Sequence, residues 1–443
     1  MTENNSISKD FNFLSLLWFS IPTIIMMVFT SIYTTVDGIF VSQFVGTNAL
    51  SAINIVYPFV FIIYGVGIML GTGGSAIIAT RMGEGKYDEA RENFTLIVIC
   101  GLVFSFVIAI LGFVFRNGIV TILGANDALM EYCVDYFTFI LVGLPALMLQ
   151  LMFQSFFVAS GKPHVGMAAI ISAGIANIVL DYIFIVPFNM GIKGAAIATS
   201  IGYCIPAVTG LVFFSSKKSV LHFTKPKWNG MVLWYSCFNG SSEMVTNIAA
   251  GIIAFMFNII MMHLLGEDGV AAITIVLYSQ FLFTAIFLGF SEGVAPVISF
   301  NHGAGNTDRI KKIFKICITI IGGCSVLSIV FSLALMNDIA AIFAPVGSKA
   351  YELSIHGFPI FSMNYIFAGL SIYASAMFTA FSNGKVSAII SFLRTFAFIA
   401  VCLAIMPNII GVDGVWLAVP VAEFLGFIIS AVFLFKYRRR YGY

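Results

Sequence analysis

Long apolar stretches alternate with short polar breaks along the whole chain. The breaks are charged or glycine-rich, as at Arg81 to Asp88 (RMGEGKYD) and Asn301 to Asn306 (NHGAGN). A helix that crosses a bilayer needs about 20 apolar residues. The pattern therefore predicts an all-α integral membrane protein whose twelve transmembrane helices lie at approximately 14–40, 50–80, 94–115, 128–158, 164–186, 193–214, 232–264, 269–300, 312–335, 350–380, 386–406 and 413–436.

The second half of the chain repeats the first at an offset of 220 positions. Residues 46–94 align without a gap with residues 266–314, and Gly191 to Ala198 aligns with Gly411 to Ala418. We therefore predict an N-lobe with spans 1–6, a cytoplasmic linker, and a C-lobe with spans 7–12. Their boundaries are 1–214, 215–230 and 231–443. A repeat of this kind is typical of transporters, whose substrate path lies between the repeats.

Basic residues divide unevenly between the two ends of the predicted spans. If the N-terminus is inside, the outer side holds only Arg116, Lys193 and Lys349, and the remaining basic residues of the breaks are cytoplasmic. The positive-inside rule then puts both termini in the cytoplasm. Because each lobe has an even number of spans, the lobes are predicted to be parallel repeats about an axis along the membrane normal.

Composition agrees with lipid as the solvent. The chain is 60% hydrophobic and 9% charged, compared with about 25% charged residues in soluble domains. The net charge of +2 gives no reason to expect a nucleic-acid partner. The seven cysteines form no C-x-x-C pair, and no phosphate-binding G-x-x-x-x-G-K-[ST] string occurs. We expect a transport protein of the bacterial or archaeal cytoplasmic membrane, monomeric, in contact with lipid and without enzymatic activity or cofactor.

Ionisable residues inside the first six spans are candidates for function, since a charge at a helix centre costs about 2.5–3.5 kcal/mol. Counting about 1.5 Å per residue puts Asp37 and Asp181 in the outer half of spans one and five. Asn177 precedes Asp181 by one helical turn, and Thr199 of span six lies at a similar depth. These four oxygen-bearing side chains predict a site for a proton or for a hard cation such as Na⁺. The alternative interpretation is that they only stabilise helix packing.

The last six spans carry different acids, because the offset of 220 positions does not reproduce the first set. Glu243 and Glu423 fall near mid-depth, which predicts contact with a cationic substrate or a role in gating. Glu292 and Arg394 fall at similar depths near the inner side, which predicts a structural ion pair between them. We therefore expect cation coupling in the N-lobe and substrate contact or gating in the C-lobe.

Six short strings resemble the multidrug and toxic compound extrusion (MATE) transporters, in their DinF-like or MepA-like branch. In chain order they are Val36 to Ser42 (VDGIFVS), Arg81 to Lys86 (RMGEGK), Asn177 to Asp181 (NIVLD), Gly194 to Thr199 (GAAIAT), Asn239 to Glu243 (NGSSE) and Pro296 to Ala304 (PVISFNHGA). The resemblance covers nearly the whole chain. It implies a V-shaped, two-lobed helical bundle that exports organic cations in exchange for Na⁺ or H⁺. It also implies that the coupling site consists of Asp37, Asn177, Asp181 and Thr199.

Three alternatives remain open. A flippase for lipid-linked oligosaccharides would have the same twelve spans, but we expect it to carry a basic central cavity for pyrophosphate. An intramembrane enzyme would need a nucleophile with its base, or metal ligands, at a common depth. A passive channel is disfavoured because selectivity filters are usually built from oligomeric rings. Uphill movement of substrate under an imposed ion gradient would distinguish an antiporter from all three.

Overall fold

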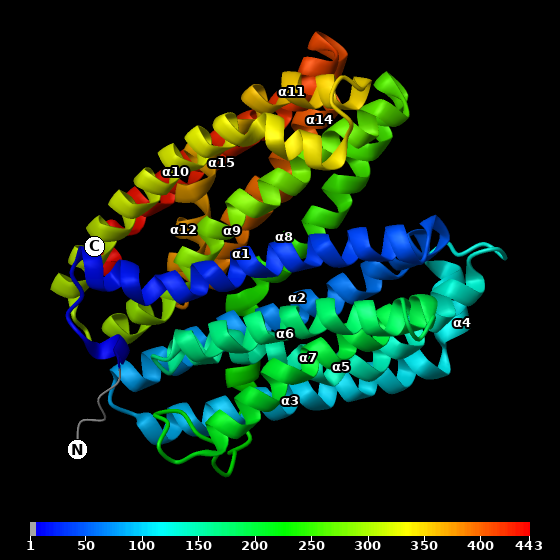
Figure 1. Cartoon of the computed structure of the whole chain (residues 1–443). Helices are drawn as coiled ribbons and strands as arrows, with labels where there is room; N and C mark the ends of the chain where they lie inside the picture. The colour runs from blue at the N-terminus through cyan, green and yellow to red at the C-terminus, as the bar shows by residue number, and fades with distance from the viewer. Residues whose placement is uncertain (1–5) are drawn as a thin grey trace.

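Helices make up all the regular secondary structure of the computed structural model, which describes residues 6–443 (Figure 1). Residues 1–5, at the start of the predicted N-lobe, lie outside the described part. The first lobe contains α1 (Phe13–Phe44), α2 (Thr47–Gly83), α3 (Tyr87–Val114), α4 (Arg116–Ile122), α5 (Met130–Ala159), α6 (Pro163–Ile185) and α7 (Gly191–Ser215). The second contains α8 (Gly230–Leu265), α9 (Glu267–Gly303), α10 (Thr307–Phe343), α11 (Lys349–Ser362), α12 (Tyr365–Ala380), α13 (Gly384–Phe392), the π-helical turn η2 (Leu393–Ala397), α14 (Phe398–Ile410) and α15 (Val412–Tyr441).

Counting a bent helix pair as one, twelve helical segments of the described residues are long and apolar enough to cross a membrane. Among the described residues, 11 helical segments are long and apolar enough to cross a bilayer, and α11 with α12 adds a twelfth that is bent by 55°. Pro359 lies within α11 shortly before the bend, where proline removes a backbone donor. At the bend itself, the side-chain Nδ2 of Asn364 donates to the carbonyl of Phe361. The predicted all-α architecture is thus confirmed.

The repeat seen in the sequence is also a repeat of helices. α2 and α9 each contain 37 residues, and their first residues, Thr47 and Glu267, are 220 positions apart. α3 and α10 also begin 220 positions apart, at Tyr87 and Thr307. The two halves therefore build the same bundle twice in the same direction.

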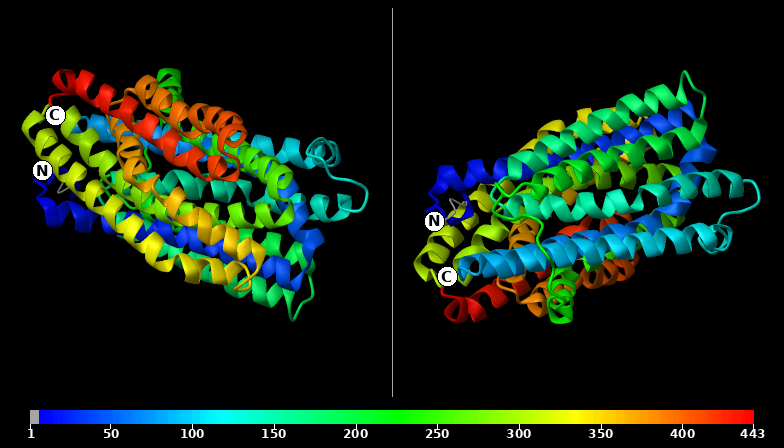
Figure 2. Two further views of the ribbon diagram at one scale, coloured as in Figure 1. Left: turned by 90° about the horizontal axis from the view of Figure 1, so that it is seen from above. Right: turned by 90° about the horizontal axis from the view of Figure 1, so that it is seen from below.

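The two bundles lie close together at one end of the molecule and diverge toward the other (Figure 1). Both chain termini lie at the end where the bundles meet. Seen from above and from below, the long helices run along roughly one axis, as membrane-spanning helices do (Figure 2). This arrangement confirms the predicted two-lobed, V-shaped bundle.

The segment between the lobes is joined to α3 by a hydrogen bond and an ion pair. The backbone N–H of Thr224 donates to Oγ1 of Thr95, 3.1 Å away, and Nζ of Lys227 lies 2.7 Å from a carboxylate oxygen of Glu92. The Glu92 carboxylate raises the pKa of Lys227 through this hydrogen bond and its charge. The chain thus leaves the first lobe in a defined direction.

Large apolar side chains are exposed on both lobes. Val142 and Val212 of the first lobe are 73% and 68% exposed, and Ile342 and Phe435 of the second are 71% and 79% exposed. Exposure to water would cost about 25 cal/mol for each Å² of such surface. These surfaces are therefore suited to the hydrocarbon core of a bilayer.

Glycines allow α2 and α9 to cross with their backbones in contact. A Cβ atom on Gly83 would collide with the carbonyl oxygen of Phe300, and one on Gly303 would collide with that of Thr80. Gly303 lies 220 positions after Gly83, and Phe300 lies 220 positions after Thr80. The crossing is therefore symmetric, as an interface between two equivalent halves should be. We call these four residues the lobe junction.

A second close crossing joins α2 to α8. A Cβ atom on Gly240 would collide with the carbonyl oxygen of Met69, and one on Gly73 would lie 2.7 Å from the backbone nitrogen of Gly240. Gly73 belongs to the glycine-rich run Gly71 to Ala76 (GTGGSA), and its lack of a side chain lets α2 and α8 approach closely.

Gly83→Ala and Gly303→Ala should each destabilise the protein, because an added methyl group at the lobe junction forces two backbones apart. Overpacking of this kind costs about 1–3 kcal/mol. The measurement is the apparent melting temperature of the purified protein in detergent. Gly322→Ala in α10 is the control, since its added Cβ meets nothing within 4 Å. Equal melting of all four proteins would contradict this account of the lobe junction.

Candidate functional site

Two buried carboxylates of the first lobe lie together between α1 and α6. Asp181 is 1% exposed, and neither of its carboxylate oxygens has a hydrogen-bond partner among the described residues. Asp37 lies seven residues before the end of α1, and its Oδ1 is likewise without a partner in the described part of the chain. The two carboxyl groups act on each other electrostatically. We call these two residues the acid pair.

Asn177 lies one turn before Asp181 in α6, as the sequence spacing predicts. It is 3% exposed, its Nδ2 has no hydrogen-bond partner within residues 6–443, and it packs toward Gly202 of α7. Thr199 lies one turn before Tyr203 of α7, but its hydroxyl donates to the carbonyl of Ala195 in its own helix, 3.0 Å away. The structure thus brings together Asp37 and Asp181. The amide nitrogen of Asn177 has no hydrogen-bond partner among the described residues, whereas the hydroxyl proton of Thr199 is donated to Ala195.

Four tyrosines, none of them anticipated from the sequence, lie near the acid pair. They come from four helices, α1, α2, α5 and α7, and each is close enough to interact electrostatically with Asp37: Tyr33, Tyr57, Tyr136 and Tyr203. One sequence signal was available, since Tyr33 precedes Asp37 by one helical turn. The other three depend on how the helices pack. Their hydroxyl groups can donate hydrogen bonds to a carboxylate or accept them from a protonated one.

A carboxylate that is buried without a donor or a counter-ion is energetically costly. Two such groups side by side cost more, because like charges repel. A bound proton or a small cation would remove the cost. Among the described residues no group of three or more His, Cys, Asp or Glu side chains has the arrangement of a metal centre. Carboxylate oxygens are suitable ligands for a proton or for a hard cation such as Na⁺.

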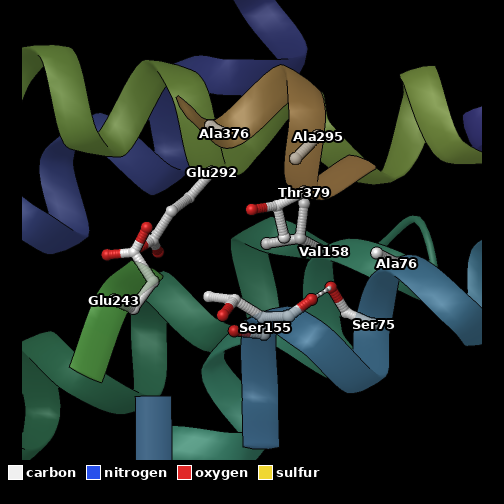
Figure 3. Close-up of a pocket in the computed structure, with 10 residues that line it drawn as sticks. Ser75, Ala76, Ser155, Val158, Glu243, Glu292, Ala295, Ala376 and Thr379 are labelled. Carbon is white, nitrogen blue, oxygen red and sulfur yellow. Dashed lines mark hydrogen bonds between the residues drawn. The ribbon is translucent and has the colours of Figure 1, made fainter. Parts of the chain in front are cut away.

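A second pair of acids lies between the lobes. Glu243 of α8 and Glu292 of α9 point their carboxyl groups toward one another (Figure 3). They line a cavity of about 30 Å³ with hydroxyl-bearing residues that include Thr72 and Ser75 of α2, Ser155 of α5 and Thr379 of α12. The walls thus come from both lobes, and the cavity in this conformation has room for about two water molecules. We call Glu243 and Glu292 the interlobe acids.

The predicted ion pair between Glu292 and Arg394 is wrong. Nη1 of Arg394 lies 2.9 Å from Oε1 of Glu423, and both side chains are buried. Depth along the helices suggested Glu292, but that residue faces Glu243 across the contact of α8 with α9. Glu423 belongs to α15, which packs directly against η2 and α14. Of the two acids predicted to contact substrate or gate, Glu243 therefore lines the interlobe cavity, and Glu423 is bound to Arg394.

Comparison with known proteins shows the same two-part organisation. A family model described as MatE matches the chain twice, over residues 22–183 and 244–405. The multidrug export proteins MepA of Staphylococcus aureus (strain MRSA252) and Staphylococcus haemolyticus (strain JCSC1435) are each 23% identical to it over 430 residues. Each alignment covers 97% of this chain and 94% of the relative.

Solved structures share the fold over almost the entire length. An outward-facing multidrug resistance MATE family transporter of the MOP superfamily superimposes with a TM-score of 0.90 at 21% identity, covering 99% of this chain and 98% of the other. A MOP superfamily transporter from Pyrococcus furiosus, described as having a binding pocket of reverse polarity, gives a TM-score of 0.88 at 20% identity and covers 100% and 98%. At these identities the likeness concerns the fold.

Arg394→Met should destabilise the protein more than the double substitution Arg394→Met/Glu423→Leu. The single change leaves a buried carboxylate without its partner, which typically costs about 3–5 kcal/mol, whereas removal of both charges is often neutral. Apparent melting temperatures in detergent measure the difference. Equal melting of the single and double variants would show that the pair contributes no electrostatic stability.

Proposed function

The chain belongs to the MatE family, and from this we propose that it is a secondary active exporter that moves organic cations out of the cell in exchange for H⁺ or Na⁺. The observation that carries the proposal is the acid pair, whose buried carboxylates have unpaired oxygens. Binding of a cation would lower the free energy of such a pair, so the pair can take up the cation on one side of the membrane and release it on the other. Asn177 supplies an amide beside Asp181, and Thr199 completes the proposed coupling site.

α1 is the element that connects the coupling site to the second lobe. It carries Asp37 and packs against α6, which carries Asp181. It also packs against α9. In the last contact Gly289 and Gly293 of α9 lie against residues 20–24 of α1. Neutralising the acid pair removes repulsion between α1 and α6. A change in the packing of α1 against α6 would therefore also change the contact of α1 with α9, in the lobe that carries the interlobe acids.

The interlobe acids are the proposed contact for the cationic cargo. Glu243 and Glu292 place two carboxylates where helices of both lobes meet. The cavity is too small for an organic cation in this conformation, so cargo would enter as the lobes separate. An acidic lining opposes a pyrophosphate-linked cargo, and this charge argument favours the exporter over a flippase for lipid-linked oligosaccharides.

The transport cycle follows from these parts. Cargo bound at the interlobe acids leaves toward the outside, the acid pair takes up its ion there, and the lobes rock about the lobe junction. Each charge that moves inward through 100 mV contributes about 2.3 kcal/mol to the cycle. We further propose that both termini are cytoplasmic, following the distribution of basic residues. One chain contains both walls of the path, so a monomer suffices.

Asp37→Asn and Asp181→Asn should each reduce uphill efflux to background, because a neutral amide no longer exchanges a proton or a cation. The measurement uses proteoliposomes loaded with a fluorescent organic cation, with Na⁺ and proton gradients imposed separately. We expect one gradient to drive efflux by the wild-type protein and thereby to identify the coupling ion. Asp413→Asn is the control, since it removes an exposed carboxylate that pairs with His356. Full gradient-driven efflux by either acid-pair variant would refute the coupling role.

Glu243→Gln and Glu292→Gln should each weaken binding of an organic cation by about tenfold, or about 1.4 kcal/mol, through loss of one carboxylate partner. Fluorescence polarisation with ethidium and purified protein gives the dissociation constant. Glu352→Gln on α11 serves as the control, because Glu352 is exposed and distant in sequence from both acids. Unchanged affinity in both variants would place the cargo elsewhere.

A further inference from the structure

The buried pair of Arg394 and Glu423 takes no part in the coupling site or in the interlobe acids, yet it is incompletely bonded. Arg394 is 7% exposed and Glu423 is 3% exposed. Beyond their one contact, Nε of Arg394 and Oε2 of Glu423 have no hydrogen-bond partner in the part of the chain that the structure describes. A guanidinium has five N–H donors and can engage two carboxylates at once. A pair that serves only stability would be expected to satisfy more of these atoms.

The backbone around Arg394 is also irregular. Arg394 lies in η2, a π-helical turn between α13 and α14, and such turns occur frequently at functional sites. Its aliphatic stem crosses Gly426 of α15, where an added Cβ atom would lie 3.1 Å from Cγ of Arg394. The π turn and the glycine together let the guanidinium reach Glu423 inside the lobe.

The same guanidinium acts on one of the interlobe acids, Glu243. α8, which carries Glu243, packs against η2, and the positive charge of Arg394 acts on the carboxyl group of Glu243 as well as on Glu423. Glu243 in turn acts on Glu292. Two carboxylates, those of Glu243 and Glu423, therefore lie in the field of one internal cation, and only Glu423 holds it by a hydrogen bond. Any cation that binds at Glu243 meets the field of Arg394.

We propose that Arg394 is an internal competitor of the exported cation at Glu243, and that Glu423 is a positioning residue that holds it away. This inference rests on the proposed function, because it assumes that organic cations bind at the interlobe acids. When cargo is present, Arg394 remains with Glu423 and leaves Glu243 free to pair with the cargo. When cargo has left, the guanidinium offsets the repulsion between Glu243 and Glu292.

The proposal makes Glu423 a determinant of affinity although it does not line the cavity. Glu423→Gln removes the charge that restrains Arg394, so the guanidinium turns to Glu243 and opposes the cargo. Arg394→Gln/Glu423→Gln removes both charges of the pair, and Glu243 is again free. A purely structural role predicts the opposite order, with the double variant at least as impaired as the single one.

The test is the dissociation constant of ethidium, measured by fluorescence polarisation on detergent-purified protein that elutes as one folded species. Couplings between sites are typically about 5–150-fold, so we expect Glu423→Gln to bind ethidium at least about fivefold more weakly than the wild-type protein. We expect Arg394→Gln/Glu423→Gln to return to within about twofold of the wild-type value, and Arg394→Gln alone to bind at least as tightly as the wild type. Asp413→Asn, on the same helix as Glu423, alters an exposed hydrogen bond with His356 and should leave the affinity unchanged.

Two patterns of failure can be separated. If Glu243→Gln weakens ethidium binding but Glu423→Gln does not, or if the double variant is as weak as Glu423→Gln, the competitor role of Arg394 is overturned and the proposed cargo site stands. If the wild-type protein binds ethidium and Glu243→Gln does not weaken it, the cargo site itself is wrong and the inference falls with it. If Glu423→Gln does not fold, the comparison of Arg394→Gln with the wild type decides, since weaker binding by Arg394→Gln contradicts the proposal.

Discussion

The close crossing of α2 and α9 at the lobe junction is the contact on which the two-lobe arrangement depends. Gly83 and Gly303 bring two backbones together without intervening side chains, and the same pair of contacts occurs from each side. Each of these helices is about 55 Å long at 1.5 Å per residue. A small rotation about the crossing therefore becomes a large displacement at the opposite end, where the bundles already diverge (Figure 1). This geometry suits the proposed rocking of whole lobes about the lobe junction.

Buried charges are distributed differently in the two lobes that this contact joins. In the first lobe the acid pair has carboxylate oxygens without a hydrogen-bond partner among the described residues, and four tyrosines interact electrostatically with Asp37. In the second lobe Arg394 binds Glu423, and its charge also acts on Glu243. The positions equivalent to Glu243 and Glu292 in the first half are Thr23 and Thr72, so the repeat retained the helices and changed the chemistry. Separate sites of this kind allow an ion and a cargo to be bound at different places, with α1 in contact with both lobes.

Counting residues along the spans predicted which ionisable side chains share a depth, but not always which of them meet. Asp37 and Asp181 were expected at one level, and the structure brings them together because α1 packs on α6. Glu292 and Arg394 also share a level, yet they face different neighbours, and Arg394 binds Glu423 instead. Residue counts give height along a helix axis, whereas the partner depends on rotation about that axis and on which helix lies alongside. None of the four tyrosines near Asp37 was predicted, and the positions of Tyr57, Tyr136 and Tyr203 depend on helix packing in the same way.

The sequence by itself determined the membrane setting, the twelve helices and the repeat. These follow from hydropathy and spacing, which are local properties of the chain. Only the tertiary structure decided which buried carboxylates share a cation and which are left unpaired. The electrostatic energy of two charges varies inversely with the distance between them, so it depends on side-chain neighbours that come from helices far apart in the sequence.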